Sequence, residues 1–394
     1  MVLIHDYAGH PFEVQLSREL HRRGHAVTHA FAGSIQTPRG HLSEVDGGLR
    51  ILEVPMGAGY VKYKYSFVRR RGLEIEYGKT LARVIRELRP EAVMSANTPT
   101  ESQSAVVEAC RDVGARFVYW IQDFYSIAVG KLLRKKLPVA GSVISAYYTH
   151  LEKRQMQGAN HVVAITRDFL PMLERWGISS DQVSVIPNWA PLDELPLMPK
   201  KNAWAAEHGL TDKRVFLYSG TLGMKHNPAL LVDLAERFRG EPDVVVVVIS
   251  EGFGMNWLKE RQKTSPLPNL RLMPYQPFER LPEVNAAADA LVTILEPDAG
   301  VFSVPSKVLT YLCAGRALLC AISMENLAAR IVAESGAGLV VHPGDGPAFL
   351  DAAARLLEDD ALRAACAEKA RGYAVKNFDI GDIAQRFEHI LFSK

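Results

Sequence analysis

Short apolar runs alternate with longer amphipathic segments along most of this chain. β-branched runs such as Val2–His5, Ala92–Ser95 and Arg116–Ile121 predict buried strands. The intervening segments, such as Phe12–Arg23 and Glu74–Leu88, carry apolar residues at helical spacing. Parallel strands joined by helical crossovers form a doubly wound sheet, which binds ligands at the carboxyl ends of its strands. The first half is therefore predicted to be a Rossmann-like α/β domain.

Prolines interrupt this pattern near the middle of the chain, in the segment Pro187-Asn188-Trp189-Ala190-Pro191 and again at Pro196 and Pro199, as is typical of a linker. The alternation then restarts at Arg214–Tyr218, which predicts a second doubly wound domain. Clefts between two such domains are preferred small-molecule sites. The expected domains are 1–190, 191–378, and a C-terminal helix over 379–394 that packs back on the first domain.

Composition narrows the class of protein. The 394 residues are 48% apolar, enough for two cores, and the formal net charge of +2 argues against a dedicated nucleic-acid binder. The four cysteines lack metal-ligand spacing and are expected to be buried thiols. No secretory leader is recognisable, and the longest apolar run, Val244–Ile249, is far short of the roughly 20 residues of a membrane span. We expect a cytoplasmic protein, peripheral at the inner face of the plasma membrane.

The segment Val304-Pro305-Ser306-Lys307 predicts a helix start that faces a phosphate. A strand-like run, Ala290–Leu295, precedes it, and Pro305 suits the first turn of a helix. Unpaired N–H groups, the positive end of the helix dipole and Lys307 together favour an anion. An ordinary strand-to-helix junction has the same features, so both interpretations stay open on these residues alone.

Other loops that follow predicted strands carry further polar and glycine residues. In the second half they are Ser219–Asn227, Ser250–Gly254 and Pro274–Pro277, and in the first half Asp6–Phe12, Asn97–Thr100 and Gln122–Tyr125. These loops would line a cleft between the two domains.

Taken in order, these motifs resemble the family 4 retaining glycosyltransferases, which have the GT-B fold, over nearly the whole chain. The matching motifs are Gly9, Arg23-Gly24-His25, Gln122-Asp123, Pro187-Asn188-Trp189, Tyr218-Ser219-Gly220, Glu251-Gly252, Pro274-Tyr275, Val304-Pro305-Ser306-Lys307 and Ala314-Gly315-Arg316. Four of them in combination, Gln122-Asp123, Pro187-Asn188-Trp189, Tyr218-Ser219-Gly220 and Val304-Pro305-Ser306-Lys307, are similar to the bacterial branch that builds colanic acid, O-antigen and other lipid-linked glycans. The resemblance implies a UDP-sugar donor, a polyprenyl-diphosphate-linked glycan acceptor, and no cofactor or metal.

The resemblance, together with the negative charge that develops during sugar transfer, assigns roles to single residues. Negative charge develops on the leaving diphosphate, and Lys225 is our first choice for the ammonium that stabilises it. Asp123 is expected to position a hydroxyl group, because retaining enzymes of this family generally need no protein base. His10 and Gln122 are expected on the acceptor side. The expected donor-binding residues are Gly9, Gly220, Thr221, Gly252, Tyr275, Ser303, Val304, Ser306, Lys307 and Thr310.

Structural roles stay open for several of these residues. Lys225 and His10 also suit solvated loops, Ser303 and Ser306 suit helix caps, Gly220 suits a simple turn, and Tyr275 suits packing below the cleft.

Three positions depart from the family pattern. Phe302 and Thr310 stand where the family has two glutamates, and Thr221 stands where it has an arginine. Lys307 is the candidate for the lost positive charge, and Glu296 or Asp298 for a lost carboxylate. Gln122 also replaces a histidine seen in many relatives.

Two basic clusters lie in the first half, at residues 60–71 among aromatic residues and at Lys131–Lys136 among leucines. They suit an anionic membrane surface or a lipid diphosphate, although such clusters are more often solvated faces. Two other functions stay open: a UDP-sugar epimerase of the same fold, which the missing glutamates disfavour, and a noncatalytic nucleotide-sugar-binding protein.

Overall fold

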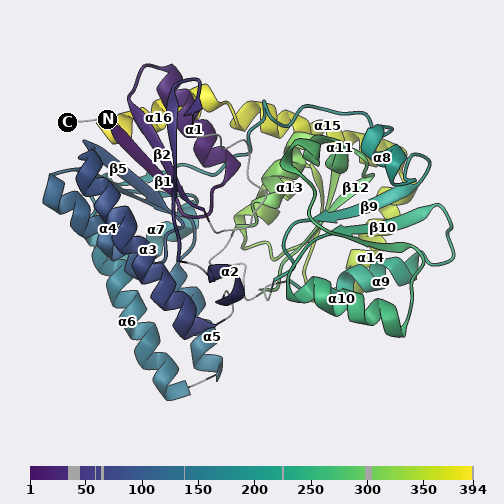
Figure 1. Cartoon of the computed structure of the whole chain (residues 1–394). Helices are drawn as coiled ribbons and strands as arrows, with labels where there is room; N and C mark the ends of the chain where they lie inside the picture. Colours follow the sequence, from purple (N-terminus) through teal and green to yellow (C-terminus); the bar gives the residue numbers. More distant parts are fainter. Residues whose placement is uncertain are drawn as a thin grey trace. The chain divides into compact units, whose positions relative to one another are not determined.

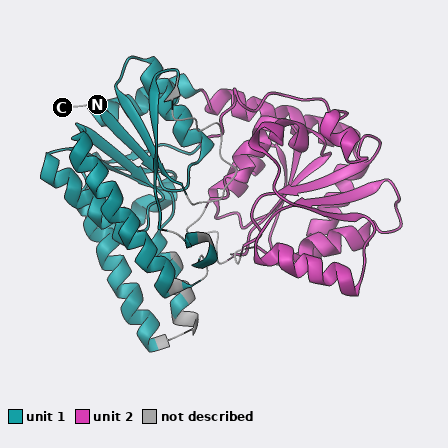
Figure 2. Cartoon of the chain, in the orientation of Figure 1, with its two compact units in different colours: residues 1–188, 380–394 teal, residues 189–379 magenta. Residues whose placement is uncertain are grey.

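The computed structural model describes residues 1–33, 45–57, 59–63, 66–136, 138–223, 226–297 and 304–392. The chain forms two compact units, coloured separately in Figure 2. Unit 1 comprises Met1–Asn188 and Ile380–Lys394, and unit 2 comprises Trp189–Asp379. These limits differ by one or two residues from the domain limits expected above.

Unit 1 contains an eight-stranded sheet of order β3-β4-β2-β1-β5-β6-β7-β8, in which only the β3–β4 pair is antiparallel (Figure 1). The strands are β1 Val2–Asp6, β2 Val27–Ala32, β3 Val45–Asp46, β4 Leu49–Val54, β5 Ala92–Ala96, β6 Arg116–Ile121, β7 His161–Ala164 and β8 Val183–Val185. The helices are α1 Pro11–Arg22, α2 Tyr60–Tyr63, α3 Phe67–Leu88, α4 Thr100–Val113, α5 Tyr125–Lys136, α6 Pro138–Gln157, α7 Leu170–Arg175 and α16 Ile380–Phe392, with 3₁₀ turns η1 Arg167–Phe169 and η2 Ser180–Gln182.

The C-terminal helix α16 is part of unit 1, where it packs against α1, β5 and β6. Phe387 lies in the core with its ring centroid 4.8 Å from that of Trp120. At the rim, Glu388 accepts hydrogen bonds from Arg23 at 2.7 Å and His25 at 2.6 Å. The Arg23-Gly24-His25 turn therefore anchors the end of the chain in this unit.

The helix expected over Glu74–Leu88 is longer than its apolar periodicity indicated, because α3 begins at Phe67. Arg70 and Arg71 in its first turns make ion pairs with Glu74 at 2.8 Å and Glu101 at 2.6 Å, respectively. Part of the expected basic cluster is thus neutralised within the fold.

Unit 2 contains a six-stranded, fully parallel sheet of order β11-β10-β9-β12-β13-β14. Its strands are β9 Arg214–Ser219, β10 Val244–Ile249, β11 Leu270–Met273, β12 Ala290–Ile294, β13 Ala317–Ala321 and β14 Gly338–Val341. Its helices are α8 Ala203–Glu207, α9 Ala229–Arg237, α10 Phe253–Thr264, α11 Leu281–Ala286, α12 Lys307–Ala314, α13 Leu327–Ser335, α14 Gly346–Glu358 and α15 Asp360–Asn377, with the 3₁₀ turn η3 Phe278–Arg280. Every residue of the continuous apolar strand β10 is buried, as expected of a central parallel strand covered on both faces.

Two expectations from composition can be compared with this fold. All four cysteines, Cys110, Cys313, Cys320 and Cys366, are free and buried, which confirms the prediction of core thiols. Within the described ranges, no helix combines the length and apolarity needed to cross a bilayer.

Candidate functional site

Polar and glycine residues follow the carboxyl ends of the parallel strands in both units. Because all strands of a parallel sheet point the same way, these loops meet at one edge of each sheet. In unit 1 this edge holds Asp6 as the last residue of β1, Asn97 after β5 and Gln122-Asp123 after β6. In unit 2 it holds Gly220 after β9 and Gly252 after β10, with Tyr275 after β11.

In unit 2, the side chain of Lys307 extends from the first turn of α12 across the loop that follows β9. Its Nζ lies 3.6 Å from the centroid of the buried Tyr218 ring, a cation–π contact. Gly220 has a φ of 130°, and a Cβ there would lie 3.0 Å from Lys307 Cε and 3.1 Å from Nζ. The backbone conformation thus favours glycine at this position, and a Cβ there would also push against the lysine side chain.

Three tyrosines fix the loop after β9. Tyr311 on α12 accepts a hydrogen bond from the N–H of Ser219 at 2.8 Å and donates to its carbonyl at 3.1 Å. Tyr218 donates to the carbonyl of Thr221 at 2.9 Å, and the Thr221 hydroxyl lies 2.5 Å from that of Tyr275. The structure therefore joins three predicted donor-side loops through Lys307, Thr221 and Tyr275.

Gly252 closes the same edge beside Leu222. With a φ of 104°, Gly252 precedes α10, and a Cβ there would lie 3.0 Å from the Leu222 carbonyl oxygen. The N–H of Leu222 is bound by the Ser250 hydroxyl at 3.0 Å, and its carbonyl accepts from the N–H of Gly254 at 2.9 Å. The loops after β9 and β10 therefore support each other through backbone contacts.

The start of α12 differs in detail from the expected one. The helix begins at Lys307, two residues after Pro305, and the exposed side chain of Ser306 makes no capping hydrogen bond. The capping role left open for Ser306 is therefore wrong, because the N–H of Val308 is bound instead by the Pro305 carbonyl at 3.2 Å. Val304 and Thr310 are half-buried on either side of this turn.

Several predicted residues lie outside the described residues. They are Lys225, Ser303, Phe302 and Asp298. Their expected roles therefore stay predictions.

In unit 1, His10 forms a tight pair with the buried carboxylate of Asp6. The Nδ1 atom of His10 lies 3.1 and 3.2 Å from the two Asp6 oxygens, and the carboxylate also accepts from the N–H groups of Ala8 and His10. Gly9, with a φ of 73°, allows the turn between them. Burial opposes the charge of Asp6, but its contacts with His10 and Ala8 outweigh burial and lower its pKa to about 2.

Glu13 and Asn97 complete this cluster; Asn97 lies in a loop that was expected to line the cleft, but sequence reasoning missed Glu13. Glu13, in the first turn of α1, is fully buried and accepts from Asn97 Nδ2 at 3.1 Å. Burial, and then the charge of Asp6, raise the pKa of Glu13 well above its ordinary value. Asn97 has a φ of 54°, a strained conformation for a residue other than glycine. The signal available in the sequence was the spacing of Asp6, His10 and Glu13 across a strand end and a helix start.

Asp123 is exposed at the end of β6, and its negative charge contributes to the raised pKa of His10. Burial lowers the pKa of His10, but the Asp6 charge and hydrogen bond, followed by the Asp123 charge, outweigh it. The preceding Gln122 is buried, and its side-chain carbonyl accepts from Asn188 Nδ2. The structure thus places Asp123 near His10, while Gln122 pairs with Asn188 after β8.

The Asp6, His10 and Glu13 side chains offer ligand atoms within 4.8 Å of one another, a spacing that could hold a metal ion. Both oxygens of Asp6 are already engaged by hydrogen bonds from Ala8 and His10, and Glu13 is biased towards its protonated form. Metal ligands must be deprotonated and free to coordinate. This donor set therefore suits a hydrogen-bonded cluster better than a metal centre.

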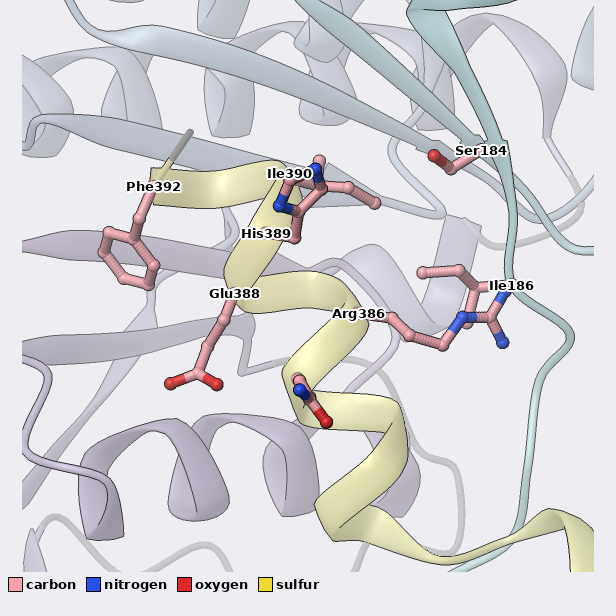
Figure 3. A pocket seen from close by; sticks show the side chains of 8 residues that line it. Ser184, Ile186, Arg386, Glu388, His389, Ile390 and Phe392 are labelled. Carbon is pink, nitrogen blue, oxygen red and sulfur yellow. The ribbon is translucent and has the colours of Figure 1, made fainter. Parts of the chain in front are cut away.

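A cavity of about 760 Å³ lies at α16 in unit 1, between Ser184, Ile186 and helix residues that include Arg386 and His389 (Figure 3). Figure 3 shows Glu388 and Phe392 pointing away from Ser184 and Ile186, so the lining does not converge on a single point. His161, which opens β7, is bonded to Ser184 at 2.9 Å. The cavity is thus lined by β8, the residue after it and α16, and neither Asp6 nor Asp123 is among its lining residues.

Comparison with known proteins identifies both halves of the chain. Residues 14–189 match the glycosyl transferase 4-like domain family, and residues 200–373 match the glycosyl transferases group 1 family. A putative colanic acid biosynthesis glycosyl transferase, WcaI of Escherichia coli K12, is 23% identical over 281 residues, covering 70% of this chain and 67% of that protein.

Solved structures share the fold over the full length. Anabaena HepE in complex with UDP-glucose aligns with a TM-score of 0.71 at 14% identity, covering 100% of this chain and 99% of that one. WaaG, a glycosyltransferase involved in lipopolysaccharide biosynthesis, aligns with a TM-score of 0.72 at 17% identity and covers 100% of both chains. With two parallel-sheet units and two matching glycosyl transferase domains in this order, the chain belongs to the family 4 glycosyltransferases of the GT-B fold.

Proposed function

We propose that this enzyme transfers a sugar, with retention of configuration, from a UDP-sugar to a lipid-linked glycan in bacterial surface polysaccharide assembly. The observation that carries the donor half is the Lys307 ammonium, held over Gly220 and Tyr218 at the strand ends of unit 2. A half-buried ammonium in the first turn of a helix suits a diphosphate.

The named relatives support this choice of substrates. HepE binds UDP-glucose, WcaI is named for colanic acid biosynthesis, and WaaG is involved in lipopolysaccharide biosynthesis. A nucleotide-sugar donor and a glycan acceptor agree with the names of all three proteins.

In the proposed reaction, the bond between the sugar carbon and the diphosphate oxygen breaks while the acceptor hydroxyl attacks the same face. Lys307, together with Lys225, stabilises the negative charge on the leaving UDP, and no metal or cofactor is required. The leaving phosphate oxygen takes the acceptor proton, and Asp123 positions a hydroxyl group. We assign nucleotide binding to Thr221 and Tyr275, whose hydroxyl groups contact each other.

On the acceptor side, His10 is the proposed contact for an anionic or hydroxyl group of the glycan carrier. Its Nδ1 is engaged by Asp6, which leaves Nε2 as the ring atom for a ligand. A polyprenyl-diphosphate carrier would hold the enzyme at the inner face of the plasma membrane.

A donor screen tests this function directly. Purified enzyme is incubated with single UDP-, GDP- and ADP-sugars and membrane lipid extract, and the released nucleoside diphosphate is measured. Lys307→Met should reduce release from the best donor by at least tenfold, whereas Lys263→Met, which alters an exposed lysine paired with Glu260 on α10, should not. Conversion of a UDP-sugar without UDP release would favour the epimerase, and binding without any turnover would favour the noncatalytic protein.

A further inference from the structure

Arg70 lies in the first turns of α3, where it contacts the start of α5, and the proposed reaction does not use it. Its Nε donates to the Glu74 carboxylate at 2.8 Å, and its Nη2 donates to the Tyr125 hydroxyl at 3.2 Å. The side chain of Glu74 is 4% exposed, whereas that of Arg70 is 34% exposed. The pair therefore combines a buried carboxylate with a guanidinium that reaches the solvent.

Tyr125 places this pair beside the residue that is proposed to position a hydroxyl group. It is the first residue of α5 and comes two residues after Asp123, so their Cα atoms are at most about 7 Å apart. Its backbone N–H donates to Glu152 at 3.0 Å, which anchors the start of α5. A ligand that contacts the Tyr125 side chain is thus close to Asp123.

Two further tyrosines connect the pair to the loop after β1. Tyr60 of α2 donates a hydrogen bond to Glu74, and the Tyr7 hydroxyl donates to that of Tyr60 at 3.2 Å. Tyr7 directly follows Asp6, the last residue of β1. Helices α2, α3 and α5 meet at this end of unit 1 (Figure 1). Arg70 is therefore connected to the loops that follow both β1 and β6.

Stability alone does not explain why this cluster is polar. Burial raises the pKa of Glu74 although the charge of Arg70 opposes it, so ionising this carboxylate in the fold is costly. Apolar side chains of similar volume often replace a buried ion pair without loss of stability. Tyr7 and Tyr60, both buried, also carry hydroxyl groups where phenylalanine rings would fill nearly the same space. Costly polar groups gathered at strand ends are typical of a binding site.

The groups that remain for a ligand are hydrogen-bond donors. Among the described residues, Arg70 bonds through Nε and Nη2, which leaves the N–H groups of Nη1 to donate. Because the Tyr125 oxygen accepts from Arg70, its own O–H proton points elsewhere and can donate as well. Two donors next to a half-buried aromatic ring suit the oxygen atoms of a hydroxyl-rich molecule such as a sugar.

The net charge of the cluster distinguishes a sugar from a phosphate. Glu74 neutralises Arg70, and Glu101 neutralises the neighbouring Arg71 at 2.6 Å. A phosphate is bound best by positive charge that no carboxylate compensates, such as the ammonium of Lys307 over the Tyr218 ring. A neutral set of donors therefore matches sugar hydroxyl groups better than the diphosphate of a lipid carrier.

We propose that Arg70 and Tyr125 bind hydroxyl groups of the terminal acceptor sugar, and that Arg70 determines which acceptor is used. This inference rests on the proposed function, to which it adds the residues that recognise the glycan itself and not its carrier. Glu74 and Tyr60 are positioning residues that hold the guanidinium. A site built to bind a hydroxyl group rejects an analogue without it, because its buried polar groups are then left unpaired.

Steady-state kinetics with the full-length enzyme test this assignment. UDP release is measured at saturating donor over a dilution series of membrane lipid extract, which supplies the acceptor. Arg70→Met should raise the extract concentration for half-maximal rate by about tenfold or more, because it removes charge-assisted donors. The KM for the donor should stay unchanged, because Lys307 and Tyr275 belong to unit 2. An unchanged extract requirement would overturn the proposal, and an equal rise in donor KM would make Arg70 a structural residue.

Three variants separate recognition from folding. Arg86→Met removes an arginine that pairs with Asp112 at 2.7 Å, about 24 Å further along α3, and should behave as the wild type. Tyr125→Phe keeps the Arg70–Glu74 pair, so it tests the site even if Arg70→Met fails to fold, and it should raise the extract requirement about threefold to tenfold. Arg70→Lys keeps the charge but not the planar fork, so it should restore thermal stability and only part of the acceptor affinity. Full recovery of affinity in Arg70→Lys would contradict recognition through the fork.

Binding of the glycan alone keeps this inference separate from the proposed transferase activity. Glycans released from the extract by mild acid, which lack the lipid diphosphate, are added to the enzyme with UDP present and followed by saturation-transfer NMR. The sugar protons should be saturated by the wild type and by Arg86→Met but much less by Arg70→Met, whether or not UDP is released in the donor screen. The inference fails if the wild type gives no glycan signal, or if inorganic pyrophosphate displaces the glycan. UDP release without a glycan signal would leave the transferase function standing and remove this subsite, and the reverse result would do the opposite.

Discussion

Nδ1 of His10 lies 3.1 Å from Oδ2 of Asp6, at the end of the first strand of unit 1. This pair raises the pKa of the imidazole and fixes which ring nitrogen remains for a ligand. Because the folded-state pKa of His10 is raised, the pair stabilises the protein fully below the ordinary value of 6.5, and this contribution is lost as pH rises through the folded-state value.

The first prediction concerns this pair. In an NMR titration, the His10 ring should titrate above 6.5, and Asp6→Asn should move its pKa down because the neighbouring negative charge is gone. His21→Gln, in the last turn of α1, which begins directly after His10, removes another ring signal and so helps to assign that of His10 without altering the pair. An unchanged His10 titration in Asp6→Asn would show that the two side chains do not interact in solution.

The second prediction concerns Glu13. Its raised pKa means that the folded state holds a proton that the unfolded chain releases, so this group costs stability as pH rises above about 4.5. Glu13→Gln keeps the shape and the acceptor for Asn97 but cannot ionise. The variant should therefore lose less unfolding free energy than the wild type between pH 5 and pH 8 in urea denaturation. Glu108→Gln, at an exposed position on α4, is the control and should leave the slope unchanged.

The fold was predictable because its signals are local. Buried strands such as β10 are continuous apolar runs, and the loops at their carboxyl ends follow from parallel topology alone. Prolines at 187 and 191 likewise flank the junction between the units, which the structure puts between Asn188 and Trp189.

The side-chain network of the site was less predictable because it depends on contacts between distant residues. In the sequence, Glu13 resembles an ordinary carboxylate at a helix start. Only its burial beside Asn97, which the sequence does not show, explains its raised pKa. Lys307 was chosen for its charge, but nothing in the sequence indicates that it crosses Gly220 to reach Tyr218. Ser306 occupies the N-cap position of α12, but its backbone is already helical, with a φ of −59° and a ψ of −26°, and its exposed side chain makes no capping hydrogen bond.

The third prediction concerns Gly220, over which the side chain of Lys307 passes. Gly220→Ala forces a residue with a Cβ into a φ of 130° and against Lys307, and we expect a loss of about 1–3 kcal/mol in unfolding free energy from the backbone alone. Donor affinity should also fall, because Lys307 is displaced. In a Lys307→Ala background, Gly220→Ala should keep the stability loss but have no further effect on donor binding, as measured by calorimetry with UDP. A full additional loss of affinity there would show that Gly220 acts on the donor independently of Lys307.

The last prediction concerns Glu152, which connects α6 to the loop that holds Asp123. Burial raises the pKa of Glu152 to about 7, although hydrogen bonds from Ser126 and Tyr125 favour its charged form. Since the folded state binds the proton more tightly, stability should fall as pH rises from the ordinary value of 4.5 through about 7.

Glu152→Ala removes the acceptor for two N–H groups and should let the Asp123 loop shift. A shift of about 1 Å is enough to reduce kcat roughly tenfold to a hundredfold. The KM for the donor should change little, because Lys307 and Tyr275 belong to the other unit. Glu152→Gln, which keeps an acceptor oxygen, should restore most of kcat and flatten the dependence of stability on pH between 5 and 8. If Glu152→Ala raises the donor KM as strongly as it lowers kcat, the helix acts on overall folding and not on the position of Asp123.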